Sequence, residues 1–261
     1  MKRTKEKKTE GSQKKKRKKT ALLPLLDNDG FFEVELTVDK EGNPLGTETK
    51  RDGRKRQFAH QEGNYPTHIF CVLKPRSSQD FKEVIKKVVG TCNEKLGEII
   101  TEKGFTQEES VHISLSRPFA LRYHQIQPLV TEVTKRFTST RKFEVCMPEC
   151  ILLGNDDKSR MFASLRVDKG KSTITSLIKQ VDEAISLFGL TPYYEDPIPH
   201  ASVGWALPAH FDAGSTEGKP RLDNTIGKPI TCDFDAEDTI CDVEEIRIKS
   251  GAYSYSIFLQ K

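Results

Sequence analysis

Two short motifs in the chain pair a histidine with a serine two residues later. They are His112-Ile113-Ser114 and His200-Ala201-Ser202. Alternate side chains of a strand point to the same face, so each histidine would share a face with its serine. One imidazole can take a proton from a nucleophile while another gives one to a leaving group, and hydroxyls can donate hydrogen bonds to phosphate oxygens. The two motifs therefore indicate acid–base chemistry on a phosphate ester.

The elements that must position these motifs occur twice in the same order. A strand, a long helix and a strand that opens with His-x-Ser are predicted at 67–116 and again at 161–205. Hydrophobic periodicity predicts strands at 67–73, 111–116, 143–153, 161–167, 200–207, 243–249 and 254–259, and helices at 78–103, 122–137 and 173–188. This order predicts an α/β or α+β fold of two lobes related by a pseudo-twofold axis. If the lobes face each other, both motifs line one cleft.

Charge is distributed unevenly along the 261 residues. Residues 1–20 have a net charge of +9, whereas the rest of the chain has a net charge of −5. The run Lys14–Lys19 is too polar to be stabilised by burial, so we expect it to be disordered. It is typical of a nuclear-localisation signal, although an arm that contacts nucleic-acid phosphates or a solubilising tail would have the same composition.

These features predict a disordered basic tail and irregular lead-in at 1–50, followed by a two-lobed domain at 51–261. No apolar run is long enough to cross a membrane, and no apolar stretch follows the basic N-terminus as in a secretory signal. We therefore expect a nuclear protein that binds no membrane and is a monomer. Its nuclear import receptor would bind Lys14–Lys19.

The cysteines and acidic residues indicate neither a metal site nor a disulfide framework. The six cysteines include no C-x-x-C pair, which favours free thiols in a reducing compartment. An acidic group near the C-terminus lies in a loop-like stretch, where solvation is the simpler interpretation; it comprises Asp233, Asp235, Glu237 and Asp238. The prediction is that the protein needs no metal and no cofactor.

Four further histidines, at positions 60, 68, 124 and 210, have no serine two residues later. His68 lies on a predicted strand, where it is a candidate for a structural role or for support of a catalytic residue. We expect the other three to be solvated.

Beyond the paired motifs, the chain resembles the two-histidine (2H) phosphoesterase superfamily. Within it the resemblance is to the family of U6 small nuclear RNA phosphodiesterases, over about residues 50–261. The stretches that carry it are 53–60, 63–68, 112–117, 155–162, 194–202 and 254–259. The resemblance implies a pseudo-twofold fold with a central cleft between two antiparallel sheets flanked by helices. It also implies trimming of the 3′ end of RNA, the oligo(U) tail of U6 small nuclear RNA or a similar substrate.

Site residues follow from the resemblance position by position. It implies that His112 and His200 are catalytic and that Ser114 and Ser202 hold phosphate, with Tyr194 stacking on a base. An aromatic residue six positions before a histidine is independently a reasonable stacking platform. The other residues that the resemblance assigns to substrate binding are Ile113, Ile198, Pro199, Ala201 and, near the terminal nucleobase, Asp156.

With no metal cluster and no Ser-His-Asp order in the sequence, the substrate's own 2′-hydroxyl is the simplest nucleophile. One histidine would deprotonate it and the other would protonate the departing 5′-oxygen, leaving a 2′,3′-cyclic phosphate. We favour His112 as base and His200 as acid, although the sequence does not separate the two roles. A metal-dependent nuclease and a non-catalytic RNA-binding module are the alternatives. The negative net charge of the body disfavours the binding module.

Overall fold

A computed structural model describes residues 17–24, 31–38, 62–101, 103–108, 110–209 and 225–261, with no side-chain description for the first two segments. In chain order its elements are β1 (Arg17–Pro24), β2 (Phe31–Val38), β3 (Asn64–Pro75), α1 (Ser78–Leu96), β4 (Thr106–Gln107), β5 (His112–Ser114), β6 (Phe119–Arg122), α2 (Tyr123–Phe137), β7 (Phe143–Val145), β8 (Glu149–Gly154), β9 (Met161–Arg166), α3 (Lys171–Ser186), β10 (His200–Ala206), β11 (Pro229–Ile230), the 3₁₀ helix η2 (Ala236–Thr239), β12 (Cys241–Ser250) and β13 (Tyr253–Phe258). No helix in these residues is both long and apolar enough to span a membrane.

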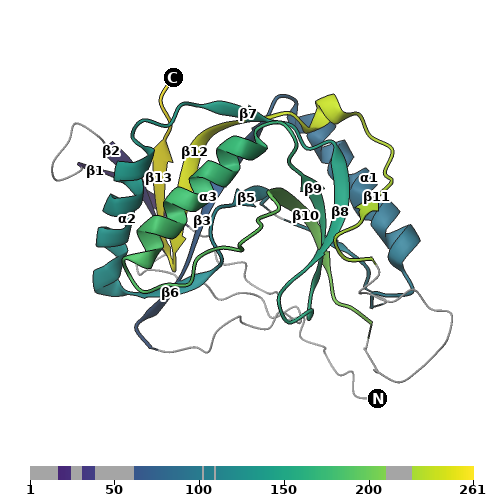
Figure 1. The fold of residues 1–261 in the computed structure, drawn as a ribbon, viewed down its shortest axis with the longest axis horizontal. Helices are drawn as coiled ribbons and strands as arrows, with labels where there is room; N and C mark the ends of the chain where they lie inside the picture. Colours follow the sequence, from purple (N-terminus) through teal and green to yellow (C-terminus); the bar gives the residue numbers. More distant parts are fainter. Residues whose placement is uncertain (1–16, 25–30, 39–61, 102, 109, 210–224) are drawn as a thin grey trace, which may run out of the picture.

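The strands form one antiparallel sheet in the order β1-β2-β13-β12-β3-β5-β10-β9-β8-β11. One half of the sheet, around β3, β12 and β13, lies beside α2 and α3, and the other half, around β8, β9 and β10, lies beside α1 (Figure 1). The predicted mixed α/β class is confirmed. The expected two sheets are the two halves of a single hydrogen-bonded path that passes through the short strand β5.

Strand β5 joins the halves because it pairs on both of its edges. Ile113 lies across from Cys71 of β3 on one side and Ala201 of β10 on the other. All three side chains have 0% exposure and belong to the hydrophobic core. The neighbours of Ile113 on β5, His112 and Ser114, alternate to the opposite face of the sheet.

Most predicted elements are confirmed, and the differences are local. The helix expected to reach residue 103 ends at Leu96, and the strand expected at 143–153 is divided into β7 and β8 around Pro148. After α3, Gly189 has φ +67° and its N–H donates to Ser186, while the N–H of Leu190 donates to Ile185. This is the hydrogen-bond pattern of a glycine-terminated helix.

Two strands lie within 1–50, where the sequence predicts a disordered tail and irregular structure. Strand β2 pairs with β13, and β1 pairs with β2. The sequence of β2, Phe-Phe-Glu-Val-Glu-Leu-Thr-Val, is rich in residues that favour strands, and β13 offers it an unpaired edge. The first 16 residues and 39–61 lie outside the described residues, so the boundary at residue 50 stays a prediction.

Replacing Ile113 by Ala should destabilise the protein by roughly 2–5 kcal/mol, because a fully buried side chain at the junction of both halves leaves a cavity. Urea unfolding measures the change. Leu187→Ala is the control, since Leu187 is 68% exposed and its loss should change the free energy of unfolding by less than 0.5 kcal/mol, the usual range for surface substitutions. A loss below about 1 kcal/mol at Ile113 would contradict the assigned junction.

Candidate active site

The two His-x-Ser motifs meet on one face of the sheet. Strands β5 and β10 are antiparallel, and their register pairs Ile113 with Ala201. His112 therefore lies across from Ser202, and Ser114 lies across from His200. Because the paired residues between them point into the core, all four polar side chains lie on the other face, here called the catalytic face. The sheet thus brings the two predicted catalytic histidines and both serines together.

Both imidazoles are held in the same way. Nδ1 of His112 lies 2.9 Å from the carbonyl oxygen of Ser110, and Nδ1 of His200 lies 2.6 Å from the carbonyl oxygen of Ile198. A carbonyl oxygen only accepts, so Nδ1 carries the hydrogen in each ring. Nε2 of each neutral imidazole is then the atom that can take up or release a proton.

Burial lowers the pKa of both catalytic-face histidines below the ordinary value of 6.5. The hydrogen bonds to Ser110 and Ile198 oppose this shift, whereas the positive charge of Lys249 adds to it at His112 and that of His112 adds to it at His200. In the free protein both rings are therefore neutral at pH 7. A bound phosphate would raise both pKa values, because an opposite charge favours the protonated form.

The two serines have different partners. The Oγ of Ser114 lies 3.1 Å from Nε2 of His68, and the Oγ of Ser202 lies 3.2 Å from the Oγ of Ser164, which is fully buried. The suggested supporting role of His68 thus has a structural basis. Sequence reasoning missed Ser164, because its position depends on the register of β9 with β10, which pairs it with Ser202.

His68 also packs against the other rings at the site. Its ring centroid lies 5.3 Å from that of Phe70 and 5.2 Å from that of His112. Burial, with the charges of His112 and Lys249, lowers the pKa of His68 to about 3. His68 is therefore neutral at any pH at which the protein would work.

Tyr194, Asp156 and Arg117 form a cluster that draws together three distant segments. The Tyr194 hydroxyl donates to Oδ1 of Asp156 at 2.7 Å, and Nη1 of Arg117 donates to Oδ2 of the same carboxylate at 3.2 Å. The Arg117 guanidinium also lies 4.0 Å from the centroid of the Tyr194 ring. Tyr194 is nevertheless 42% exposed, so part of its ring can receive a base. Arg117 is within the resembling stretch 112–117, but no feature of the sequence indicated this contact.

The turn between β8 and β9 presents Asp156 to this cluster. Oδ1 of Asn155 accepts the N–H of Arg160 at 2.9 Å, and Oδ1 of Asp157 accepts the N–H of Ser159 at 3.1 Å. Side chains that hydrogen-bond the backbone in this way stabilise a tight turn. The carboxylate of Asp156 therefore projects from a fixed turn toward Tyr194.

The remaining predicted substrate-binding residues differ in exposure. The side chains of Ile113 and Ala201 are fully buried on the core side, so a ligand on the catalytic face could meet only their backbone. Their assignment to substrate binding stays a prediction. Pro199 is also buried, and its carbonyl oxygen accepts the N–H of Val167. Ile198 is 44% exposed beside His200 and is available for contact.

Among the other histidines, His124 is exposed on α2, as expected, and His60 and His210 lie outside the described residues. Within the described part of the chain, no three His, Cys, Asp or Glu side chains gather as metal ligands. Asp235, one of the acidic residues considered for a metal, instead accepts the N–H of Glu237 and caps η2.

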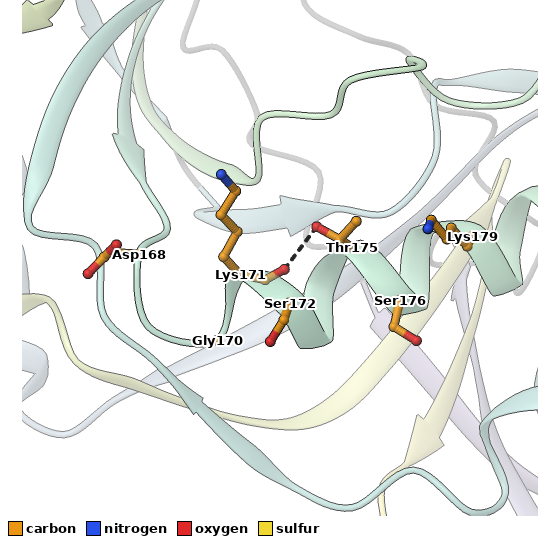
Figure 2. Close-up of a pocket in the computed structure, with 7 residues that line it drawn as sticks. All are labelled: Asp168, Gly170, Lys171, Ser172, Thr175, Ser176 and Lys179. Atoms are coloured by element: carbon orange, nitrogen blue, oxygen red, sulfur yellow. Dashed lines mark hydrogen bonds between the residues drawn. The ribbon is translucent and has the colours of Figure 1, made fainter.

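A pocket of about 620 Å³ lies at the start of α3 and is lined by Asp168, Gly170, Lys171, Ser172, Thr175, Ser176 and Lys179 (Figure 2). Neither His-x-Ser motif lines it. Its hydroxyl and lysine side chains extend from one helix, and Thr175 is bonded to the carbonyl of Lys171 within that helix. The chemistry of the catalytic face is therefore separate from this pocket.

Replacing His68 by Gln should make stability less dependent on pH. The unfolded chain takes up a proton at this histidine below pH 6.5, whereas folded His68 does not until about pH 3, so stability is lost as the pH falls. From pH 7 to pH 5 this amounts to about 2 kcal/mol, which the variant should not lose. Urea unfolding at both pH values measures it, with exposed His124→Gln as the control. Equal pH dependence in the two variants would contradict the buried, neutral state of His68.

Comparisons with known proteins agree with this geometry. A family model named HVSL, described as an uncharacterised conserved protein, matches residues 37–258. U6 snRNA phosphodiesterase 1 of Dictyostelium discoideum is 35% identical over 187 residues, which are 71% of this chain and 64% of that protein; the Xenopus laevis protein of that name is 28% identical over 228 residues, 86% of each. The chain thus spans slightly less than two thirds of the Dictyostelium relative.

A solved structure shares the fold at low sequence identity. Kluyveromyces marxianus Usb1 superposes with a TM-score of 0.51 at 14% identity, over 74% of this chain and 98% of that one. The resemblance predicted from the paired motifs is therefore confirmed. The chain belongs to the HVSL family, and its relatives include the U6 snRNA phosphodiesterases.

Proposed function

We propose that the protein is a metal-independent 3′–5′ exoribonuclease that trims the 3′ end of U6 small nuclear RNA or a similar oligouridylated RNA. The observation that carries this proposal is the pair of imidazoles on one sheet face, each with Nδ1–H donated to a carbonyl and Nε2 left for proton transfer. The names of the relatives support the RNA substrate. A structure of Kluyveromyces marxianus Usb1 with uridine monophosphate supports a uridine at the terminal position.

The reaction needs one proton acceptor and one proton donor. Nε2 of one histidine takes the proton of the 2′-hydroxyl on the ribose that precedes the cleaved phosphate. The 2′-oxygen then bonds to phosphorus as the bond from phosphorus to the 5′-oxygen of the terminal nucleoside breaks. Nε2–H of the other histidine supplies the proton to that oxygen. The products are a free nucleoside and an RNA that ends in a 2′,3′-cyclic phosphate.

The serines would stabilise the negative charge that develops on the non-bridging phosphate oxygens. Ser114 and Ser202 flank the Ile113–Ala201 pair from either side, so their hydroxyls can donate to the two non-bridging oxygens. For Ser114 this requires that Nε2 of His68 donates to its Oγ, which leaves the hydroxyl hydrogen for the phosphate.

The place of Tyr194 in the chain supports an assignment of the two histidine roles. Tyr194 precedes His200 by six residues, and exposed Ile198 lies between them in the sequence. A terminal nucleoside stacked on Tyr194 would bring its 5′-oxygen toward His200, which is then the acid. His112, on the opposite strand, is then the base. Removal of one nucleoside at a time would follow if the Arg117–Asp156–Tyr194 cluster bounds the site of the terminal nucleoside.

A nuclear substrate fits the basic run Lys14–Lys19, which would bind an import receptor. A monomer suffices for the reaction, because both histidines come from one chain. The metal-dependent nuclease and the non-catalytic binding module remain as alternatives. No described feature favours either over two proton-transferring imidazoles, and the following experiments separate them.

Replacing His112 or His200 by Ala should lower single-turnover cleavage of a uridine-ended oligoribonucleotide by roughly 10²–10⁴-fold, the contribution of one acid–base group. His124→Ala, an exposed histidine on α2, is the matched control and should cleave like the natural protein. Excess EDTA should have no effect. A metal-dependent nuclease would instead lose activity in EDTA, and a binding module would cleave in none of these reactions.

Loss of the Tyr194 ring should weaken binding of the terminal nucleoside more than it slows the chemical step. Tyr194→Ala should raise KM about 10-fold, the lower part of the range for base stacking. Tyr194→Phe keeps the ring but loses the bond to Asp156, and Arg117→Met loses the cation over the ring; each should raise KM about 2- to 5-fold. Steady-state kinetics on the same oligonucleotide test the series. An unchanged KM in Tyr194→Ala would exclude stacking there.

A further inference from the structure

Lys249 is a cation on the catalytic face without an assigned role. It lies on β12 directly across from His68 of β3, and β3 in turn pairs with β5. Its side chain is exposed, and none of the other described side chains forms an ion pair with it. Two other cations of β12 and β3 differ: Arg247, on the same face of β12, is bonded to Glu245, and Lys74, farther along β3, is paired with Glu244. Lys249 is therefore available for an anion from outside the protein.

The charge of Lys249 acts on the reaction centre. After burial, it is one of the causes that lower the pKa of His112, and it also contributes at His68. The ring of His68 lies between the two, with its centroid 5.2 Å from that of His112. Strand β12 is two strand spacings from β5, roughly 10 Å between backbones, and His112 lies across from Val72, four residues along β3 from His68. The His68 ring spans this offset, because it contacts the His112 ring and lies across from Lys249. The Lys249 ammonium is therefore on the side of the site where a group adjacent to the cleaved phosphate could meet it.

The direction of the RNA follows from the roles proposed above. The terminal nucleoside would lie toward Tyr194 and His200, and the ribose with the attacking 2′-hydroxyl would lie at His112. The chain 5′ of that ribose must then continue away from β10, across β3 toward β12. The first charged group that it carries in this direction is its next phosphate.

We propose that Lys249 binds the backbone phosphate on the 5′ side of the ribose that carries the attacking 2′-hydroxyl. Lys249 would thus form an upstream phosphate subsite for single-stranded RNA. This inference rests on the proposed function and extends it to a second nucleotide position. A lysine offers a point charge without base selectivity, so the subsite would recognise the length of the RNA and not its sequence. The terminal base would be bound at Tyr194, whereas the need for a preceding nucleotide would be imposed at Lys249.

A comparison of two substrates tests the subsite. UpU has only the cleaved phosphate, whereas UpUpU has one upstream phosphate as well. In the natural protein kcat/KM should be higher for UpUpU than for UpU. Lys249→Met should lower the ratio of kcat/KM for UpUpU to kcat/KM for UpU by about 3- to 10-fold. Lys249→Arg keeps the charge and should restore most of the ratio. Lys87→Met removes the same charge from an exposed position on α1 and should leave the ratio unchanged. An equal ratio in the Lys249→Met and Lys87→Met proteins would overturn the proposal.

A binding measurement keeps this test independent of cleavage. An oligouridylate with 2′-deoxyuridine before the last phosphate cannot supply the nucleophile, so its Kd can be measured at several salt concentrations. Lys249→Met should reduce the slope of log Kd against log salt by about 0.7, the contribution of one phosphate contact in a single strand. An unchanged slope would overturn the subsite even if cleavage behaves as proposed. If the natural protein binds with the expected slope but cleaves no RNA, the proposed reaction fails and the subsite stands.

Discussion

The antiparallel register of β5 with β10 is the constraint on which the site depends. Ile113 has a partner on each side and is fully buried, which holds the two halves of the sheet in a single alignment. A shift of β5 by one residue would turn His112 and Ser114 into the core and expose Ile113 instead, while His200 stayed on the catalytic face. The burial of Ile113 and Ala201 therefore determines that His112 lies across from Ser202, and His200 across from Ser114. The chemistry of the site follows from this alignment.

The two halves use this alignment for different purposes. In both, a carbonyl two residues before the histidine fixes the same tautomer. Around this common core the surroundings diverge: the half-buried imidazole of His68 supports Ser114, whereas the buried hydroxyl of Ser164 supports Ser202. The half around β3, β12 and β13 adds exposed Lys249. The half around β8, β9 and β10 adds the cluster of Tyr194 and Asp156 with Arg117. A symmetric pair of proton-transfer groups thus lies in an asymmetric cleft, as expected for a substrate with distinct 5′ and 3′ sides.

Much of the fold could be predicted from the sequence, because apolar spacing in 67–73, 173–188 and 243–249 reflects burial directly. The paired motifs could also be found, since strand alternation relates each histidine to its serine. Contacts such as Arg117 with Tyr194 could not, because they join segments far apart in the chain. Nor could the burial of Ile113 and Pro199, because a resemblance indicates positions near a ligand but not the direction of each side chain. Strands β1 and β2 were missed because their pairing depends on the free edge of β13.

The central claim is that the substrate's own 2′-hydroxyl is the nucleophile, that one imidazole takes its proton and that the other protonates the departing 5′-oxygen. The most direct measurement is mass spectrometry of the products from two oligoribonucleotides that differ only at the ribose before the cleaved phosphate, one with 2′-hydroxyl and one with 2′-deoxy. We expect the first to be shortened to a 2′,3′-cyclic phosphate, or to the monophosphate if the same cleft opens the ring. We expect the second to bind and remain intact. Cleavage of the deoxy substrate at a comparable rate would show that water or a protein side chain attacks phosphorus, and it would contradict the mechanism.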